Sequence, residues 1–415
     1  MAFAYRGGVL CAEQVPLDEI ARRFGTPCYV YSRGVIEGNL ARFADALAGR
    51  KSLIAYSVKA NSNLALLALM TRLDAGFDIV SGGELARVLA AGGDPRKVVF
   101  SGVGKTQAEI EQALRAGILC LNLESEAELE RVAATAARLG VRAPVAFRVN
   151  PDVDAKTHPY ISTGLKDNKF GIAYADAERV YRSAARHASL ELVGIGCHIG
   201  SQLTSAAPFV DAAARILALT ERLERAGIGL SHVDLGGGFG IRYKDESPAS
   251  IGEFLKGALA VLAGRKETLI VDPGRSIVGE AGVLLTRVEY LKPGESKNFL
   301  VVDAAMNDFI RPALYGAWHE VRQVREMESD AVAGVYDIVG PVCESADFLA
   351  RERELAVRAG SLLAVMSAGA YGMVMSSNYN TRPRPAEVMV SGASATLVRE
   401  RETVNQLFAA ERLLP

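Results

Sequence analysis

Leu53-Ile54-Ala55-Tyr56-Ser57-Val58-Lys59-Ala60-Asn61 is the stretch that indicates the fold, because an apolar, strand-like run ends on a single lysine, Lys59. A second apolar stretch, residues 64–70, follows at once. A charged amine at the end of a buried strand is costly unless it has a partner. The common partners are a carboxylate, in an ion pair, and a carbonyl compound, in a covalent imine. The residues at the ends of the other strands bear on which of the two applies.

The order of strand, turn and helix that begins at residue 53 recurs along the chain. We expect strands at residues 53–58, 77–80, 98–100, 118–121, 145–149, 192–198, 232–235 and 269–271. Between them, apolar residues are spaced by three to four, as in amphipathic helices, at residues 83–91, 106–116, 125–139, 209–226 and 251–262. Eight such units in roughly 220 residues favour a TIM-like (β/α)8 barrel over a doubly wound open sheet, which shares the alternation.

The sequence changes character after about residue 282. Long amphipathic helices become rare, and turn signals such as Lys292-Pro293-Gly294-Glu295 separate short strands. We expect these strands at residues 283–291, 299–302, 336–339, 362–367, 387–390 and 395–399. The predicted fold is therefore α/β, with a barrel at residues 31–281 and a mainly β domain at 282–415. Residues 1–30 are predicted to pack with the β domain, with a strand at 9–12 and a helix at 17–24.

The composition is that of an ordinary globular enzyme. The 415 residues include 23% charged residues and carry a formal net charge of -1, which gives no electrostatic footprint for nucleic acid. The first residues lack the layout of a secretory signal, and no apolar run is long enough to span a membrane. The five cysteines, Cys11, Cys28, Cys120, Cys197 and Cys343, are scattered without CxxC spacing. We therefore expect a cytoplasmic protein without disulfides or a metal site.

Polar and small residues follow most of the predicted barrel strands. In a parallel barrel the carboxyl ends of all strands meet at one rim, where catalytic groups gather. The residues expected there are Lys59, Ser81-Gly82-Gly83, Arg148, Asn150, His198-Ile199-Gly200-Ser201-Gln202, Asp234 with Gly236-Gly237-Gly238, and Asp272-Pro273-Gly274-Arg275. This convergence is more specific than any one of the motifs.

Lys59 and the glycine run together predict pyridoxal 5′-phosphate (PLP). The glycines Gly236-Gly237-Gly238 would let backbone amides approach a phosphate. The alternative is a flexible turn, but the position of the run after the seventh strand favours a phosphate site. Lys59 would form the imine with the cofactor. Asp272 is placed to pair with the pyridine nitrogen and His198 to pack on the ring, the alternative for His198 being a hydrogen-bonded core histidine.

Four of these stretches, residues 56–61, 196–202, 235–240 and 272–275, resemble those of the alanine-racemase-like PLP enzymes, in their decarboxylase branch. Within that branch, residues 158–164, 311–315, 343–347 and 376–380 are most similar to the diaminopimelate decarboxylase family. The resemblance covers nearly the whole chain. It implies decarboxylation of meso-2,6-diaminopimelate to L-lysine and carbon dioxide, the last step of lysine biosynthesis.

The resemblance also implies a role for each matching residue. Lys59 would carry the cofactor, His198 would stack on its ring, and Ser201, Gly236, Gly237, Gly238 and Gly274 would hold its phosphate. The carboxylate at the unreactive end of the substrate would be bound by Arg275, Arg311 and Tyr315, and the ammonium there by Glu344. Tyr371 would contact both cofactor and substrate, and Cys343, or alternatively Lys59, would donate the proton. Because Cys343 and Glu344 reach the partner's site in such enzymes, a head-to-tail homodimer is implied.

Two residues depart from the family pattern. Asp272 stands where the family usually has glutamate, and Ser57 where it favours alanine or proline. The Asp272 side chain is one methylene shorter, so for it to contact the pyridine nitrogen the loop or the ring must shift, or a water must bridge the two. Three alternatives stay open: a related decarboxylase acting on ornithine, arginine or carboxynorspermidine, a Schiff-base aldolase that uses Lys59 without PLP, and a non-catalytic PLP carrier.

Overall fold

The computed structural model describes residues 3–154 and 169–415, so residues 158–164 of the resemblance lie outside the described part of the chain. Contacts divide the chain into two units. One, here called the barrel unit, comprises Leu40–Arg242 and Glu246–Ser276, and the other, the β unit, comprises Met1–Asn39, Tyr243–Asp245 and Ile277–Pro415. Each is described by itself.

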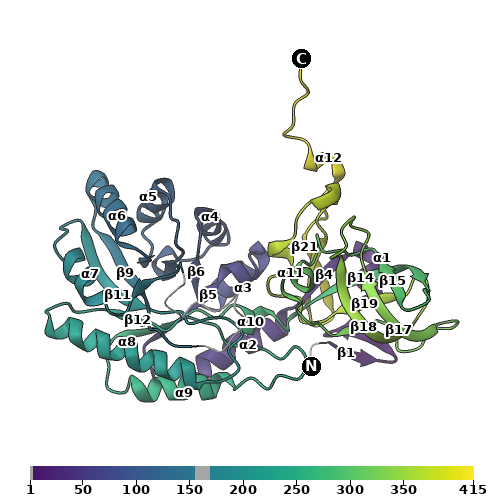
Figure 1. Cartoon of the computed structure of the whole chain (residues 1–415), viewed down its shortest axis with the longest axis horizontal. Coiled ribbons are helices and arrows are strands. Elements are labelled where there is room, and N and C mark those ends of the chain that lie inside the picture. Colours follow the sequence, from purple (N-terminus) through teal and green to yellow (C-terminus); the bar gives the residue numbers. More distant parts are fainter. Residues whose placement is uncertain (1–2, 155–168) are drawn as a thin grey trace. The chain divides into compact units, whose positions relative to one another are not determined.

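Eight parallel strands form a closed ring in the barrel unit (Figure 1). In ring order they are β5 (Ser52–Ser57), β6 (Gly76–Ile79), β7 (Val98–Phe100), β8 (Cys120–Leu123), β9 (Ala143–Asn150), β11 (Leu190–Gly196), β12 (His232–Asp234) and β13 (Thr268–Val271). The ring closes because β13 pairs with β5, Ile270 lying opposite Leu53. The predicted (β/α)8 barrel is confirmed, and the open sheet is excluded. A short strand, β10 (Ile172–Ala173), adds to β9.

Helices surround this ring on its outside (Figure 1). They are α3 (Leu64–Arg72), α4 (Gly82–Ala90), α5 (Gln107–Ala116), α6 (Glu126–Leu139), α7 (Ala177–Ala184), α8 (Ala207–Arg225) and α9 (Ile251–Val261). Several begin at a side chain that accepts a hydrogen bond from the first turn, namely Asn63, Ser81, Thr106, Ser125 and Ser250. These caps end the loops that follow the strands, and so fix the length of each loop at the rim.

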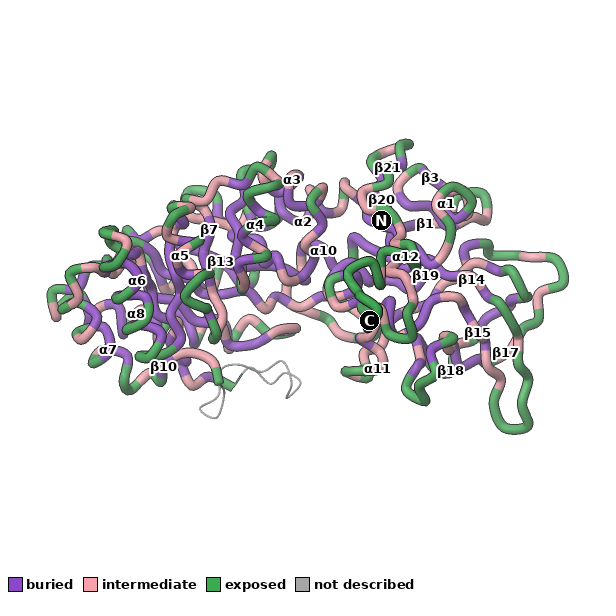
Figure 2. The backbone as a smooth tube through the Cα atoms, turned by 90° about the horizontal axis from the view of Figure 1, so that it is seen from above, coloured by how far each residue is buried: buried purple, intermediate pink, exposed green. Residues whose placement is uncertain are grey.

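Burial is concentrated on the strands and the inner faces of the helices (Figure 2). Small and branched side chains from five of the ring strands form one buried cluster, namely Ala55, Val99, Cys120, Ala146 and Ile270. The barrel interior is therefore a packed apolar core, and the polar groups of its carboxyl rim lie at one end of that core.

The β unit is built around the long strand β14 (Gly282–Lys292). Its sheet runs β18-β17-β15-β14-β4-β20-β21, and β19 also pairs with β14 and with β16. The bounds are β4 (Cys28–Ser32), β15 (Asn298–Val302), β16 (Val321–Gln323), β17 (Val332–Val339), β18 (Phe348–Val357), β19 (Leu362–Val365), β20 (Ala386–Ser391) and β21 (Ser394–Arg399). All six strands predicted after residue 282 are present. Two, β16 and β18, were not predicted.

The predicted amino-terminal strand forms, but a different strand joins the large sheet of the β unit. The predicted strand, β2 (Val9–Ala12), lies in a separate sheet between β1 (Phe3–Arg6) and β3 (Val15–Pro16), with one isolated bridge from Val9 to Arg325. The strand that enters the large sheet is β4, which pairs with β14 on one side and β20 on the other. All five β4 residues are buried, so its sequence lacks the alternation by which half-buried strands are recognised.

The remaining helices are short or link the units. The predicted helix at 17–24 is α1 (Leu17–Phe24), and α2 (Arg33–Ala46), α10 (Arg275–Val278), α11 (Arg311–Tyr315) and α12 (Val404–Leu407) complete the set in the described residues. Among the residues that the structure describes, no helix combines the length and the apolar character needed to cross a membrane.

Candidate active site

Lys59 forms an ion pair with a carboxylate on the neighbouring strand. It lies in a single 3-10 turn, η1 (Val58–Ala60), directly after β5, and its Nζ is 3.2 Å from Oδ2 of Asp78 on β6. The Asp78 side chain is 2% exposed and that of Lys59 is 37% exposed. The carboxylate thus holds a partly accessible amine at the barrel rim. Asp78 was not among the residues predicted for this site, although a carboxylate inside the apolar run Phe77-Asp78-Ile79 was the available signal.

Ser57 contacts the same carboxylate. Its Oγ lies 3.1 Å from Oδ2 of Asp78 and 3.0 Å from the backbone oxygen of Asp272. The other carboxylate oxygen, Oδ1 of Asp78, is buried without a hydrogen-bond partner among the described residues. The residue that departs from the family pattern is therefore built into the contacts around Lys59.

His198 is a neutral ring at the end of β11. The Gly237 amide donates a hydrogen bond to its Nδ1 at 3.3 Å, so Nδ1 is the acceptor and Nε2 carries the proton. Burial, and then the positive charges of Arg148 and Lys59, lower the pKa of His198 to about 3. An uncharged, fixed imidazole is suited to packing against a flat aromatic group.

Asp272 presents an unpaired acceptor near this ring. Its Oδ1 lies 3.7 Å from Nδ1 of His198 and is buried without a hydrogen-bond partner among the described residues. Burial, and then the charge of Asp78, raise the pKa of Asp272, and burial followed by the charge of Asp272 raises that of Asp234. A buried carboxyl of this kind is stabilised by a cationic partner. The protonated pyridine nitrogen of PLP is such a partner, so the donor set fits that cofactor.

The glycine run is required by close packing. A Cβ atom would lie 2.5 Å from the Cys197 oxygen at Gly236, 2.3 Å from the Asp272 oxygen at Gly237, and 2.1 Å from the Gly200 oxygen at Gly238. The Gly236 amide donates to Oδ1 of Asp234 at 2.8 Å, and that of Gly237 to His198. Two of the three amides are thus used within the protein, and phosphate binding by this loop stays a prediction.

Ser201 and Arg275 lie together at the same rim. Nη2 of Arg275 donates to Oγ of Ser201 at 3.0 Å, and Arg275 is buried. A Cβ at Gly274 would lie 2.9 Å from Cβ of Ala60 and 3.0 Å from Cβ of Ser57. The loop after β13 is therefore pressed against the turn that carries Lys59.

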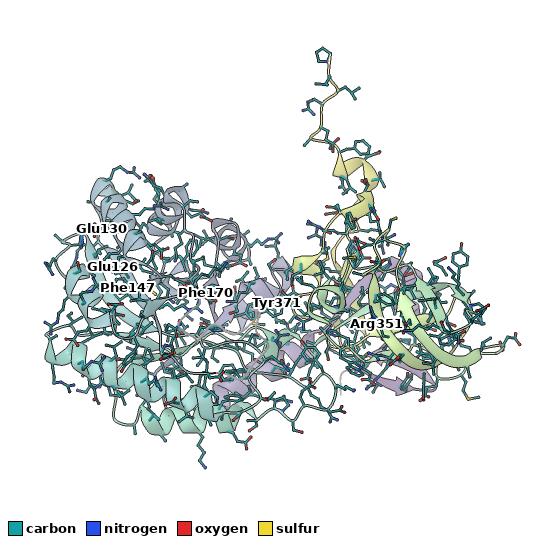
Figure 3. All side chains as sticks on the ribbon, viewed as in Figure 1. Glu126, Glu130, Phe147, Phe170, Arg351 and Tyr371 are labelled. Atoms are coloured by element: carbon teal, nitrogen blue, oxygen red, sulfur yellow. The ribbon has the colours of Figure 1, made fainter. Side chains whose placement is uncertain are left out.

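Further charged residues support this rim. Arg148 donates to Oε1 of Glu124 and to the His198 backbone oxygen, both at 3.4 Å. Its guanidinium lies 4.7 Å from the ring centroid of Phe170, which is labelled in Figure 3. Burial raises the pKa of Glu84 to about 7, even though its carboxylate accepts a hydrogen bond from the Val80 amide. Of these residues, Arg148 was predicted at the rim without a role, and Glu84 and Glu124 were not predicted.

In the β unit, Arg311 and Tyr315 lie at the two ends of α11. The guanidinium carbon of Arg311 is 5.8 Å from the ring centroid of Tyr315 and 5.5 Å from that of Tyr243. Arg311 is buried. The two residues thus lie close together, and their binding of a substrate carboxylate stays a prediction.

The other predicted residues of the β unit lie in two different segments. Cys343 and Glu344 are exposed, in the loop between β17 and β18, where the Cys343 amide donates to Oδ1 of Asn380 at 2.9 Å. Tyr371, labelled in Figure 3, is held at a φ of 56°. Such a left-handed conformation is uncommon for a bulky side chain and often marks a functional position. All five cysteines are free thiols.

Proteins similar to this chain identify its family. Residues 33–279 match the family model described as "Pyridoxal-dependent decarboxylase, pyridoxal binding domain". The chain is 61% identical to a diaminopimelate decarboxylase of Pseudomonas aeruginosa over 413 residues, covering 100% of this chain and 99% of the relative. It is 56% identical to that of Vibrio cholerae, covering 98% of each.

Solved structures give the same result. Diaminopimelate decarboxylase from Helicobacter pylori, complexed with L-lysine, matches with a TM-score of 0.92 at 42% identity, covering 95% of this chain and 99% of that one. The enzyme from M. jannaschii in co-complex with L-lysine matches with a TM-score of 0.94 at 38% identity, covering 100% and 98%. The family model over residues 33–279 and relatives of up to 61% identity over the whole chain show that the chain belongs to the pyridoxal-dependent decarboxylases, in the diaminopimelate decarboxylase family.

Proposed function

We propose that the chain decarboxylates the D-configured centre of meso-2,6-diaminopimelate and releases L-lysine and carbon dioxide. The observation that carries this proposal is the 61% identity over the full length of the chain with a diaminopimelate decarboxylase. L-Lysine, the proposed product, is the ligand in the structures of two relatives. This reaction is the last step of lysine biosynthesis.

The cofactor is pyridoxal 5′-phosphate, and the barrel rim supplies its proposed contacts. When bound, it serves as the electron sink for the pair released when the carbon–carboxylate bond breaks. Lys59 would hold it through Nζ, Asp272 would pair with its ring nitrogen, and the neutral imidazole of His198 would pack on its face. The phosphate would be bound by Ser201 and Arg275 together with the glycine residues Gly236, Gly237, Gly238 and Gly274.

Asp78 and Ser57 keep Lys59 in place. The carboxylate of Asp78 accepts from Nζ of Lys59 and from Oγ of Ser57, so it fixes where the amine lies when it is not bonded to the cofactor. An ammonium held in this way is also the alternative proton donor to Cys343. We propose Cys343 as the leading donor, because a thiol can deliver a proton to the carbon that has lost its carboxylate.

Substrate selection is proposed to depend on the unreactive end of the substrate. Arg275, Arg311 and Tyr315 would bind the carboxylate there, and Glu344 would bind the ammonium. A bidentate arginine–carboxylate pair fixes geometry as well as adding binding energy. Tyr371 would contact both substrate and cofactor. Binding both the carboxylate and the ammonium at a fixed separation would favour diaminopimelate over ornithine and arginine.

We also propose a head-to-tail homodimer in the cytoplasm. The exposure of Cys343 and Glu344 supports the dimer, because residues that complete a partner's site must lie at the surface of their own chain. The five free thiols support a reducing compartment.

The deciding experiment measures the reaction and the attachment site together. Purified protein with PLP is incubated with meso-diaminopimelate, and carbon dioxide and lysine are quantified, with ornithine and arginine as parallel substrates. Borohydride reduction followed by peptide mapping should place a pyridoxyl group on Lys59, and the Lys59→Ala variant should lack both the label and activity. Activity on ornithine alone would support the related decarboxylases, and a protein without a cofactor band would support the aldolase.

A further inference from the structure

His319 is a buried histidine with a hydrogen bond at each ring nitrogen. Its Nδ1 lies 2.9 Å from the backbone oxygen of Met366, and its Nε2 accepts from Nε of Arg311 at 3.4 Å. The residue is 1% exposed. The rings of Tyr243 and Phe309 pack edge-on against it, with centroids at 5.0 Å and 4.7 Å. Its position and its plane are therefore both fixed.

These contacts admit one protonation state of the ring. A backbone oxygen only accepts, so Nδ1 must carry a proton in its bond to Met366. The Nε–H group of Arg311 only donates, so Nε2 of His319 must be the bare acceptor. The neutral tautomer with its proton on Nδ1 satisfies both bonds, whereas an imidazolium would turn a donor toward a donor.

The bond to His319 adds a directional contact to Arg311. The rings of Tyr243 and Tyr315 lie 5.5 Å and 5.8 Å from the guanidinium carbon, and such contacts leave rotation in the guanidinium plane weakly determined. The hydrogen bond from Nε sets that rotation. Because Nε then faces His319, a two-pronged carboxylate contact would use the Nη1–Nη2 edge of the guanidinium.

We propose that His319 is a positioning residue for substrate recognition. It holds the guanidinium of Arg311 so that the Nη1–Nη2 edge is presented to the carboxylate at the unreactive end of the substrate. The inference rests on the proposed function, in which Arg311 binds that carboxylate. It adds a residue that touches neither substrate nor cofactor but decides how well one end of the substrate is held.

Two amide variants that differ by one methylene separate a positioning role of His319 from a packing role. In His319→Gln the side-chain amide reaches the level of Nε2, so its oxygen can accept from Arg311. In His319→Asn the amide reaches only the level of Nδ1, so it can donate to Met366 but leaves Arg311 without its acceptor. The readout is equilibrium binding to the PLP-loaded protein of L-lysine, which keeps the carboxylate, and of cadaverine, which lacks it.

His319→Asn is expected to weaken L-lysine binding about tenfold and to leave cadaverine binding within about twofold, since a tenfold loss corresponds to one weakened charge-assisted hydrogen bond. In turnover, KM for meso-diaminopimelate should rise by a similar factor while kcat changes little. His319→Gln should bind both ligands nearly as the wild type does. In an Arg311→Gln background, His319→Asn should add no further loss for L-lysine, because the two residues act as one unit.

Equal losses for L-lysine and cadaverine, in an otherwise active protein, would overturn the role of His319 and leave the proposed function intact. If His319→Asn fails to fold, the outcome for His319→Gln decides: a folded variant that has lost its preference for L-lysine over cadaverine overturns the inference, and a retained preference supports it. A wild-type protein that neither decarboxylates meso-diaminopimelate nor binds L-lysine would overturn the proposed function and the inference together.

Discussion

Ser57 and Lys59 share one acceptor: Oγ of Ser57 lies 3.1 Å, and Nζ of Lys59 3.2 Å, from the same oxygen of Asp78. Two residues apart on one strand end, they approach the carboxylate of the neighbouring strand together. The hydroxyl, which the family pattern lacks, therefore adds a donor to the carboxylate that holds the amine of Lys59.

Replacing Ser57 by alanine should lower the free energy of unfolding by about 1 kcal/mol, because a buried hydrogen bond is lost. Decarboxylation should persist, since the ion pair of Lys59 with Asp78 does not need the hydroxyl. Chemical denaturation measures the first effect and carbon dioxide release the second. Ser52→Ala, at the other end of β5, is the matched control and should have little effect. Abolished activity in Ser57→Ala would show that the hydroxyl is essential.

Asp78→Asn should lower the free energy of unfolding more than Ser57→Ala does. It keeps the size of the side chain but removes the charge facing Lys59, and a loss of about 1–3 kcal/mol in unfolding free energy is expected for a charge-assisted bond to a buried carboxylate. Asp74→Asn is the control, because the pair of Asp74 with Lys97 is exposed and should contribute less than about 1 kcal/mol. Equal effects at the two positions would mean that burial of Asp78 does not strengthen its ion pair.

Cys343→Ser should reduce turnover by about 100-fold while the cofactor absorbance band is unchanged, because a hydroxyl is a poorer acid than a thiol. Single-turnover measurements of lysine formation, alongside the absorbance spectrum, test this. Ser345→Ala in the same loop controls for local disturbance. Turnover at the wild-type rate would leave Lys59 as the proton donor.

Glu344→Gln should act on substrate preference. With meso-diaminopimelate, kcat/KM is expected to fall by about 100-fold, because an ammonium at the unreactive end would lose its counter-charge. A substrate without that ammonium, 2-aminopimelate, should lose far less. The ratio of the two kcat/KM values is the measurement. A ratio equal to that of the wild type would remove Glu344 from substrate recognition.

Stability should depend on pH through His232. Burial lowers the pKa of His232 from 6.5 to about 4, so the unfolded chain binds more protons between these values. The free energy of unfolding should therefore decrease by about 3 kcal/mol as the pH falls from about 6.5 to about 4. The raised carboxyl pKa values of Asp234 and Asp272 instead increase stability as the pH falls. The contribution of His232 must therefore be measured as the difference between the wild type and a variant.

His232→Asn isolates this contribution. The difference in unfolding free energy between wild type and variant should change by about 3 kcal/mol over that pH interval. His187→Asn, at the surface beside Glu130, is the control. If the difference in unfolding free energy between the wild type and His232→Asn does not change with pH, the imidazole protonates as readily in the native state as in the unfolded chain.

Much of the fold could be predicted because the barrel strands are short apolar runs that end at polar or glycine-containing turns. The missed strand β18, Phe-Leu-Ala-Arg-Glu-Arg-Glu-Leu-Ala-Val, lies at a sheet edge, where four consecutive charged residues are tolerated. β4 was missed for the opposite reason, since a strand buried on both faces shows no alternation. Hydrophobic patterning therefore finds strands that are continuous apolar runs, such as β7, and misses the charged edge strand β18 and the mixed sequence of β4.

The site was predicted where residues follow a strand and missed where they lie within one. Lys59, His198, Gly237 and Asp272 all follow strand ends, and the structure brings these four side chains or their loops into one rim. Asp78 lies inside β6. The pairing of Arg311 with His319 depends on how the chain near Met366 folds back, and no local spacing encodes that.

The placement of β4 has a consequence for synthesis. Its neighbours in the sheet, residues 282–285 of β14 and 386–390 of β20, emerge from the ribosome long after it does. At 5–20 residues per second, β4 waits on the order of 20–70 s for its last neighbour, while the barrel strands are made in one uninterrupted run. During that delay at least one edge of β4 lacks its strand partner, and such an unpaired strand is prone to aggregation. Translation that stalls before residue 386 would leave β4 without its β20 neighbour.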